Sequence, residues 1–124
     1  MGRHGDGQVG SDGYEGFPCW DGGMVVFRRR VGRHKLRAAK AVVARAVDVG
    51  INFFDTAAVY GRGRSEEYLG RAVKELGLRD RVYIATKIHG EWLRRVDILT
   101  SVENQRRRLG VDTIDLYQIH WPAC

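Results

Sequence analysis

The sequence predicts an α/β fold with parallel strands, and two observations support that prediction. Helical and extended patterns alternate along the chain from residue 34 onward. In addition, three of the expected strands end in a polar residue, Asp55, Lys87 and His120, at intervals of 87 − 55 = 32 and 120 − 87 = 33 residues. One strand–helix unit of a (β/α)8 (TIM) barrel takes about 31 residues. We therefore expect a partial barrel, about its first half.

Apolar spacing gives the expected bounds of each element. Short runs rich in β-branched and aromatic residues predict strands, whereas apolar side chains three and four residues apart predict helices. Ser65 is expected to cap the second helix, whose Glu66 and Glu67 suit the positive end of a helix dipole. Glycines close the helices. Strands are expected at residues 24–27, 51–54, 81–87 and 114–121, and helices at about 34–48, 66–76 and 101–109.

The N-terminal residues 1–23 differ from the rest of the chain in composition. They hold eight of the 16 glycines and show little apolar periodicity, which is typical of a flexible segment. We expect a flexible Gly-rich arm over residues 1–23 and a half-barrel domain over residues 24–124. A chain of 124 residues is long enough for one domain with a real core.

Composition and charge exclude some classes of function. An apolar content of 44% favours a globular chain, and no apolar run approaches the ~20 residues that a membrane span needs. The net charge of +6 suggests nucleic-acid binding, but the basic residues between Arg28 and Arg45 mostly alternate with apolar positions, as on a solvated helix face. Only residues 27–35, FRRRVGRHK, resemble a polyanion patch, and they lack an aromatic platform. Nucleic-acid binding is therefore the weaker alternative.

The two cysteines, Cys19 and Cys124, lie near opposite ends of the chain without motif spacing. Two isolated thiols of this kind predict neither a disulfide nor a metal site. The first residues, MGRHGDGQVGSDG, lack the apolar segment of a secretory signal, so a cytoplasmic location is expected.

The polar strand ends form the candidate site. Side chains alternate along a strand, so Asp55, Lys87 and His120 can all point inward at the C-terminal rim, where barrel active sites lie. Tyr60 follows Asp55 by five residues. Each residue alone has an ordinary structural explanation, as a turn residue, a strand end or a packed ring. Four such groups at one rim favour a catalytic interpretation.

These four groups suit the reduction of a carbonyl. A phenol ionises only near pH ~10, and a neighbouring ammonium favours its ionised form. Lys87 would supply that charge to Tyr60 as proton donor, and Asp55 would hold Lys87 in place. Neutral His120 would donate a hydrogen bond to the carbonyl oxygen of the substrate. The hydride must come from a cofactor, because no side chain supplies one.

Two longer segments carry a family resemblance. Residues 50–88, GINFFDTAAVYGRGRSEEYLGRAVKELGLRDRVYIATKI, and residues 107–122, RRLGVDTIDLYQIHWP, resemble the aldo-keto reductase superfamily. The resemblance implies a (β/α)8 barrel and the NADPH-dependent reduction of aldehydes and ketones. It also implies a catalytic tetrad of Asp55, Tyr60, Lys87 and His120, with Asp55 near the nicotinamide ribose of the cofactor and with His120 and Trp121 as substrate-binding residues.

The sequence also departs from the family. Members run to about 250 residues or more, and their second half normally holds the residues that stack on the nicotinamide and bind the adenosine phosphate. Residues 1–23 do not resemble the usual first strand with its glycine-containing cofactor loop, and GRGR at residues 61–64 is too short for a phosphate loop. We expect a truncated reductase, weakly active or inactive alone, with a fragment of a longer chain and a half that pairs with a partner as the alternatives.

An incomplete barrel has consequences for its partners. Open sheet edges and an exposed apolar face favour self-association or pairing with a complementary half. A small-molecule carbonyl compound is the expected substrate of the enzyme. A non-catalytic interaction module is the other alternative, because potassium-channel β-subunits belong to the same superfamily. Those relatives generally lack a histidine at the position of His120, which favours the enzyme.

Overall fold

The computed structural model describes residues 16–19, 24–27 and 35–122 of the chain. Within these ranges, five strands form one sheet in the order β1-β2-β3-β4-β5. β1 pairs antiparallel with β2, and the later neighbours are parallel. The strands are β1 (Gly16–Cys19), β2 (Met24–Phe27), β3 (Phe53–Asp55), β4 (Tyr83–Ile88) and β5 (Leu116–Ile119); the helices are α1 (Lys35–Asp48), α2 (Arg64–Glu75) and α3 (Arg95–Leu109), with short 3₁₀ turns η1 (Tyr60–Gly63) and η2 (Arg79–Arg81).

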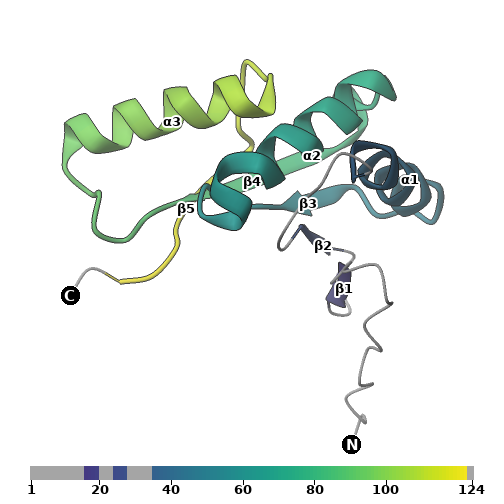
Figure 1. The fold of residues 1–124 in the computed structure, drawn as a ribbon, viewed down its shortest axis with the longest axis horizontal. Coiled ribbons are helices and arrows are strands. Elements are labelled where there is room, and N and C mark those ends of the chain that lie inside the picture. The colour runs from purple at the N-terminus through teal and green to yellow at the C-terminus, as the bar shows by residue number, and fades with distance from the viewer. Residues whose placement is uncertain (1–15, 20–23, 28–34, 123–124) are drawn as a thin grey trace, which may run out of the picture.

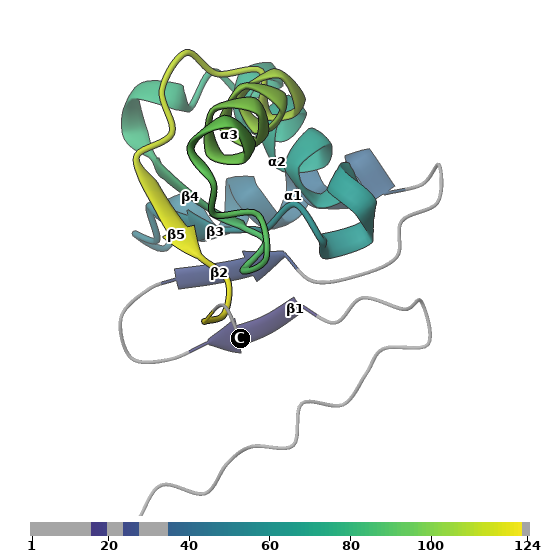
Figure 2. The ribbon, with the colours of Figure 1, turned by 90° about the vertical axis from the view of Figure 1, so that its left-hand side faces the viewer.

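The three helices lie on one face of the sheet (Figure 1). Each of them stands between two parallel strands in chain order, which confirms the predicted alternation. β5, drawn in yellow, forms one edge of the sheet, and no other described strand pairs with its outer side (Figure 2). None of the helices in the described ranges has the length and apolar character needed to cross a bilayer.

The apolar core lies between the helices and the sheet. Phe54 of β3, Ile84 of β4, Leu69 of α2 and Leu109 of α3 expose at most 1% of their surface. Full burial of one such side chain stabilises the fold by about 1.5–3 kcal/mol. α2 approaches the end of α3 closely at Gly70, where a Cβ atom would come within 2.0 Å of the Leu109 carbonyl oxygen. The packing of α2 against α3 therefore depends on the absence of a side chain at Gly70.

The predicted cap of the second helix is wrong. The N-cap of α2 is Gly63 in a left-handed conformation, and no side chain caps the helix. Ser65 is instead a buried residue within the first turn, where its hydroxyl and that of Thr56 are hydrogen-bonded at 2.8 Å. The Ser65 hydroxyl thus bonds to the chain just after β3.

The other predicted bounds differ from the structure by at most two residues, except for the start of α3. α3 begins at Arg95, six residues before the expected start at residue 101, and the Arg94 side chain donates to Asp97 across its first turn at 2.7 Å. β3 covers Phe53–Asp55, so Asp55 belongs to the strand instead of following it. The start of α3 lacks a typical capping residue, which is why the sequence pattern did not indicate it.

The expected arm over residues 1–23 contains one regular element. Gly16–Cys19 forms strand β1 against β2, an element that the sequence pattern did not indicate, and the flexibility of the arm stays a prediction. The other arm residues, 1–15 and 20–23, lie outside the described residues. The same holds for Cys124, for the side chain of Cys19 and for most of the basic segment 27–35. The strand predicted at residues 24–27 is confirmed as β2.

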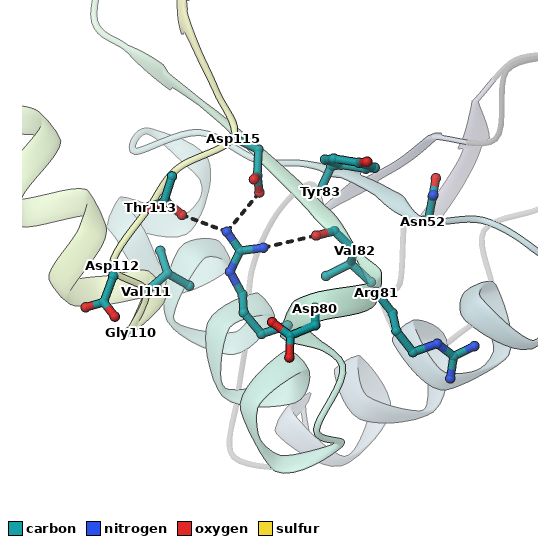
Figure 3. Close-up of a pocket in the computed structure, with 11 residues that line it drawn as sticks. Asn52, Asp80, Arg81, Val82, Tyr83, Gly110, Val111, Asp112, Thr113 and Asp115 are labelled. Atoms are coloured by element: carbon teal, nitrogen blue, oxygen red, sulfur yellow. Dashed lines mark hydrogen bonds and ion pairs between the residues drawn. The ribbon is translucent and has the colours of Figure 1, made fainter.

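A hollow lies at the N-terminal ends of β4 and β5 (Figure 3). Arg79 spans its wall, because its guanidinium donates to the carbonyls of Val82 at 3.0 Å and Thr113 at 2.8 Å and to Asp115 Oδ2 at 3.0 Å. The same Asp115 oxygen accepts the Ile84 N–H at 2.8 Å. Residues at this end of barrel strands serve stability. The Arg79–Asp115 pair therefore holds the segment before β5 against the start of β4, at the opposite end of the strands from their C-termini.

Candidate active site

The expected site residues come from neighbouring strands of the sheet. Asp55 is the last residue of β3, and Lys87 lies one residue before the end of β4. Lys87 is opposite Gln118 of β5 in the register of the sheet. His120 follows β5 directly, and its backbone N–H donates to the Ile88 carbonyl at 2.9 Å. These residues therefore lie at the C-terminal ends of three neighbouring parallel strands.

A shielded ion pair between Lys87 and Asp55 lies at these C-terminal strand ends. The Lys87 ammonium donates to Asp55 Oδ2 and to the Thr56 carbonyl, the latter at 2.9 Å. The Lys87 and Asp55 side chains expose only 14% and 8% of their surface, so water screens their attraction weakly. The other carboxylate oxygen, Asp55 Oδ1, accepts the Gln118 amide at 3.1 Å. Gln118 lies two residues before His120, and the sequence pattern gave it no role.

Tyr60 and His120 complete the cluster. Lys87 Nζ lies 5.6 Å from the centroid of the Tyr60 ring. The Tyr60 and His120 rings meet edge to face, with centroids 5.5 Å apart and planes at 86°. Asp55, Tyr60, Lys87 and His120 thus lie together in the structure, and their catalytic roles stay a prediction.

A left-handed turn connects Tyr60 to α2. Gly61, Arg62 and Gly63 have φ angles of 60°, 57° and 85°, a region that glycine adopts without steric cost. Gly63 also makes room for a neighbour, because a Cβ atom there would lie 2.7 Å from Arg108 Cδ. The GRGR segment therefore reverses the chain. The Arg108 side chain packs against Gly63 and reaches Glu66 of α2.

Aromatic side chains border the cluster. The Trp121 ring lies 4.8 Å from that of His120 and 4.3 Å from that of His89, which stacks on Trp92 at 4.9 Å. Trp121 and Trp92 expose 36% and 52% of their surface. Exposed rings beside polar groups suit the apolar part of an organic ligand. The sequence predicted a role for Trp121 but missed His89 and Trp92, because both lie in a loop where the pattern indicated no element.

The described residues fit one end of a nicotinamide cofactor. Asp55 Oδ2 accepts a hydrogen bond from Lys87, and Asp55 Oδ1 accepts one from Gln118. A carboxylate oxygen can accept a second hydrogen bond, for example from a ribose hydroxyl. The part of the chain that the structure describes holds no group of three or more His, Cys, Asp or Glu residues placed to bind a metal ion.

Comparison with known protein families decides which family this is. The aldo/keto reductase family model matches residues 22–124. The chain belongs to this family. Its fold is a partial (β/α)8 barrel: an aldo-keto reductase from Klebsiella pneumoniae, solved in complex with NADPH, is similar with a TM-score of 0.70 and 31% identity, over 75% of this chain and 32% of that one.

Curated members of the family extend this comparison. Aldo-keto reductase YhdN from Bacillus subtilis (strain 168) is 48% identical over 85 residues, which is 62% of this chain and 26% of YhdN. A probable voltage-gated potassium channel subunit beta from Oryza sativa subsp. japonica is 35% identical over 95 residues, which is 70% of this chain and 29% of that protein. This aldo/keto reductase chain therefore spans about a quarter to a third of the length of these relatives.

A buried polar network lies behind the candidate site, on the helix-facing side of β4. Glu66 of α2 is fully buried, and its Oε1 accepts the Thr86 hydroxyl at 2.6 Å and the Gln105 amide at 2.8 Å. Glu66 Oε2 accepts Arg108 Nε at 2.6 Å. The Tyr117 hydroxyl donates to Gln105 Oε1 at 2.5 Å. These bonds and the paired guanidinium offset the cost of burying the Glu66 carboxylate.

Tyr117 is expected to give the stability of the chain a dependence on alkaline pH. Burial of the phenol and the nearby Glu66 carboxylate raise the pKa of Tyr117 to about 12, while Arg108 acts in the opposite direction. The folded chain then keeps the phenol proton at pH values where an unfolded chain, with an ordinary phenol pKa of about 10, has lost it. The contribution of Tyr117 is present below pH ~10 and should be lost as the pH rises toward ~12.

Urea denaturation of the wild type and of Tyr117→Phe at about pH 9, 10 and 11 measures this effect. The difference between the two isolates Tyr117, because all other tyrosines and lysines titrate in both proteins. We expect the stability advantage of the wild type to shrink as the pH rises. A difference that stays constant over this range would contradict the raised pKa of Tyr117.

Proposed function

We propose that this chain provides the catalytic tetrad of an aldo/keto reductase that reduces aldehydes and ketones to alcohols with NADPH. One observation carries the proposal: the Lys87 ammonium contacts both the Asp55 carboxylate and the Tyr60 ring, and His120 lies beside that ring. Family membership supports the same assignment. So does the solved Klebsiella pneumoniae family member, which is in complex with NADPH.

In the proposed reaction, Tyr60 gives its phenol proton to the oxygen of the substrate carbonyl. The Lys87 ammonium stabilises the phenolate that remains, because opposite charges attract strongly where water is largely excluded. Asp55 holds that ammonium in place through their direct hydrogen bond. His120 donates a hydrogen bond to the same carbonyl oxygen and stabilises the negative charge that develops there.

The cofactor and the substrate meet at this cluster. NADPH supplies the hydride that reduces the carbonyl carbon. In this proposal Asp55 accepts a hydrogen bond from the nicotinamide ribose, His120 contacts the carbonyl group, and Trp121 provides an apolar wall for the rest of the substrate. The substrate is a small carbonyl compound. The cytoplasmic location expected from the N-terminal sequence stays a prediction.

In this proposal, the exposed apolar surfaces of the chain contact further strands and helices of a complete barrel. Leu116 and Ile119 of the edge strand β5 expose 44% and 58% of their surface. Val96 and Leu99 of α3 expose 63% and 56%. We infer that these apolar surfaces pack against the remaining part of a barrel, which relatives carry in the rest of their length. Without it, the exposed edge and apolar face favour self-association of the chain.

Activity of the isolated chain tests how complete the site is. We expect little or no oxidation of NADPH with a generic aldehyde by the purified 124-residue chain, because the chain spans only about a quarter to a third of the length of its relatives. Robust reduction that Tyr60→Phe abolishes would contradict this expectation and would show that the chain is an enzyme by itself.

A chimera tests the roles of the tetrad. Residues 35–122 of this chain replace the equivalent segment of YhdN, and the rest of YhdN supplies the other strands. We expect the chimera to reduce a generic aldehyde with NADPH, and Tyr60→Phe to lower kcat by about 10²–10⁴-fold, the usual contribution of general acid catalysis. Tyr68→Phe, on a residue of α2 that packs against the core, is the matched control and should keep the rate. An equally active Tyr60→Phe chimera would overturn the assignment.

A non-catalytic interaction module is the second candidate function, supported by the likeness to a probable potassium channel subunit beta. The edge-to-face contact of His120 with Tyr60 favours the enzyme, because it brings a hydrogen-bond donor beside the proposed acid. The same chimera separates the two candidates. An interaction module would leave the chimera folded and inactive with all four side chains in place.

A further inference from the structure

Neighbouring residues of β4 face opposite sides of the sheet. The Thr86 hydroxyl donates to Glu66 on the helix side, whereas the Lys87 ammonium contacts Asp55 on the other side. The backbone of Thr86 and Lys87 therefore connects the buried polar network to the candidate active site. A contact that fixes the Lys87 backbone from the helix side also fixes the base of the Lys87 side chain.

The Lys87 carbonyl is held by a side chain beyond the end of β3. β3 ends at Asp55, opposite Ala85, and the Ala85 carbonyl accepts the Thr56 N–H at 2.9 Å. Carbonyls two residues apart in a strand point to the same side, so the Lys87 carbonyl points past the last residue of β3. There Gln105 Nε2 donates to it at 2.9 Å. Gln105 thus takes the place of one more bond of the sheet.

The Gln105 amide has partners that fit only one orientation. Its nitrogen lies 2.9 Å from the Lys87 carbonyl, 2.8 Å from Glu66 Oε1 and 3.1 Å from Thr86 Oγ1, so two protons serve three acceptors. Its oxygen accepts the Tyr117 hydroxyl at 2.5 Å. A flipped amide would set its oxygen against the Glu66 carboxylate. Because Gln105 is only 1% exposed, water does not replace these partners.

We infer that Gln105 is a positioning residue for Lys87. From the helix side of β4, its amide fixes the Lys87 carbonyl and so sets where the Lys87 ammonium lies between Asp55 and Tyr60. Gln105 itself touches neither the substrate nor the reacting atoms. The inference rests on the role proposed for Lys87, but it can be tested without cofactor and without turnover.

The reactivity of Lys87 toward an acylating reagent provides the test. The chain has four lysines, at positions 35, 40, 74 and 87, and mass spectrometry gives the rate of modification at each. Modification of Lys87 should be slow in the wild type, because its ammonium is ion-paired and only 14% exposed. In Gln105→Met the Lys87 rate should rise about fivefold, as expected for the loss of one net hydrogen bond. Lys40 and Lys74 are internal controls and should keep their rates.

Two further variants separate positioning from a loss of stability. Val73→Ala removes volume from the apolar core and should lower stability while leaving the Lys87 rate unchanged. Tyr117→Phe removes only the hydroxyl that holds the Gln105 oxygen, and it should raise the Lys87 rate by a smaller factor. If Gln105→Met does not fold, Tyr117→Phe decides the question.

The outcomes are distinct from those of the functional tests. An unchanged Lys87 rate in the folded Gln105→Met chain, or in Tyr117→Phe where Gln105→Met does not fold, would overturn the inference. An equal rise in Val73→Ala would overturn it as well, because general loosening would then explain the effect. An inactive chimera would count against the proposed function alone, since the Lys87 rate requires no catalysis.

Discussion

Replacing Glu66 with alanine is expected to lower the free energy of unfolding by about 3–5 kcal/mol, the usual cost of removing one partner of a buried ion pair. Glu66 is fully buried and accepts hydrogen bonds from Thr86, Gln105 and Arg108. Without it, the first two donors lose an acceptor in the interior. Arg108 is 28% exposed and can turn toward water, which favours the lower end of the range. Because domains are stable by only about 5–15 kcal/mol, this is a large fraction of the total.

Urea denaturation followed by circular dichroism measures the effect of Glu66→Ala. Glu67→Ala is the matched control, because it makes the same chemical change at the next, exposed position of the same helix end. The control should stay within about 0.5 kcal/mol of the wild type, as exposed substitutions usually do. The free energy of unfolding of Glu66→Gln should lie between those of Glu66→Ala and Glu67→Ala, since its amide oxygen still accepts hydrogen bonds but lacks the charge. Equal losses in Glu66→Ala and Glu67→Ala would contradict the buried network.

Replacing Gly70 with alanine is expected to destabilise the chain by about 3 kcal/mol or more, at or above the upper end of the usual cost of overpacking. A Cβ atom at this position would lie 2.0 Å from the carbonyl oxygen of Leu109 and 2.5 Å from its carbonyl carbon. These are backbone atoms, so no rotation of a side chain relieves the contact. α2 and α3 would have to move apart, and the buried side chains between them would lose contacts.

The sign of this effect makes it a sharp test. In an ordinary helix interior, glycine to alanine stabilises by about 1 kcal/mol, because alanine has the higher helix propensity. Thermal unfolding of Gly70→Ala should instead show a lower Tm. Arg71→Ala, at the next and exposed position of α2, is the control for changes in propensity and should have little effect. A higher Tm for Gly70→Ala would contradict the close approach of α2 and α3.

The parallel sheet and the central ion pair could be predicted because they follow from local patterns. Apolar spacing identified the strands β2 to β5 and the three helices, but it missed β1 and the start of α3. Asp55 and Lys87 lie one barrel unit apart, at neighbouring strand ends, and parallel strands bring such ends together. The direct contact of Lys87 with Asp55 therefore follows from a repeat that is visible in the sequence.

The parts that could not be predicted depend on contacts between distant residues. Ser65 has the residue type and position of a helix cap, but its hydroxyl is bonded to Thr56 because the loop closes on itself. Glu66 finds its partners Gln105 and Arg108 39 and 42 residues further along the chain. No spacing rule indicates that a glutamate in the first turn of a helix is fully buried, or that a glutamine in another helix reaches the backbone beside a strand end.

The loop that carries Tyr60 is closed at its base. The Thr56 and Ser65 hydroxyls join its two ends at 2.8 Å, and the Lys87 ammonium holds the Thr56 carbonyl at 2.9 Å. Residues 55–66 can therefore be treated as a cassette for protein engineering. We expect the segment to keep its conformation when it is transferred. In another barrel, the recipient site would need a lysine on the next strand at the position that Lys87 has here. Exchange of this one segment would then place the Asp55 carboxylate and the Tyr60 phenol beside that lysine.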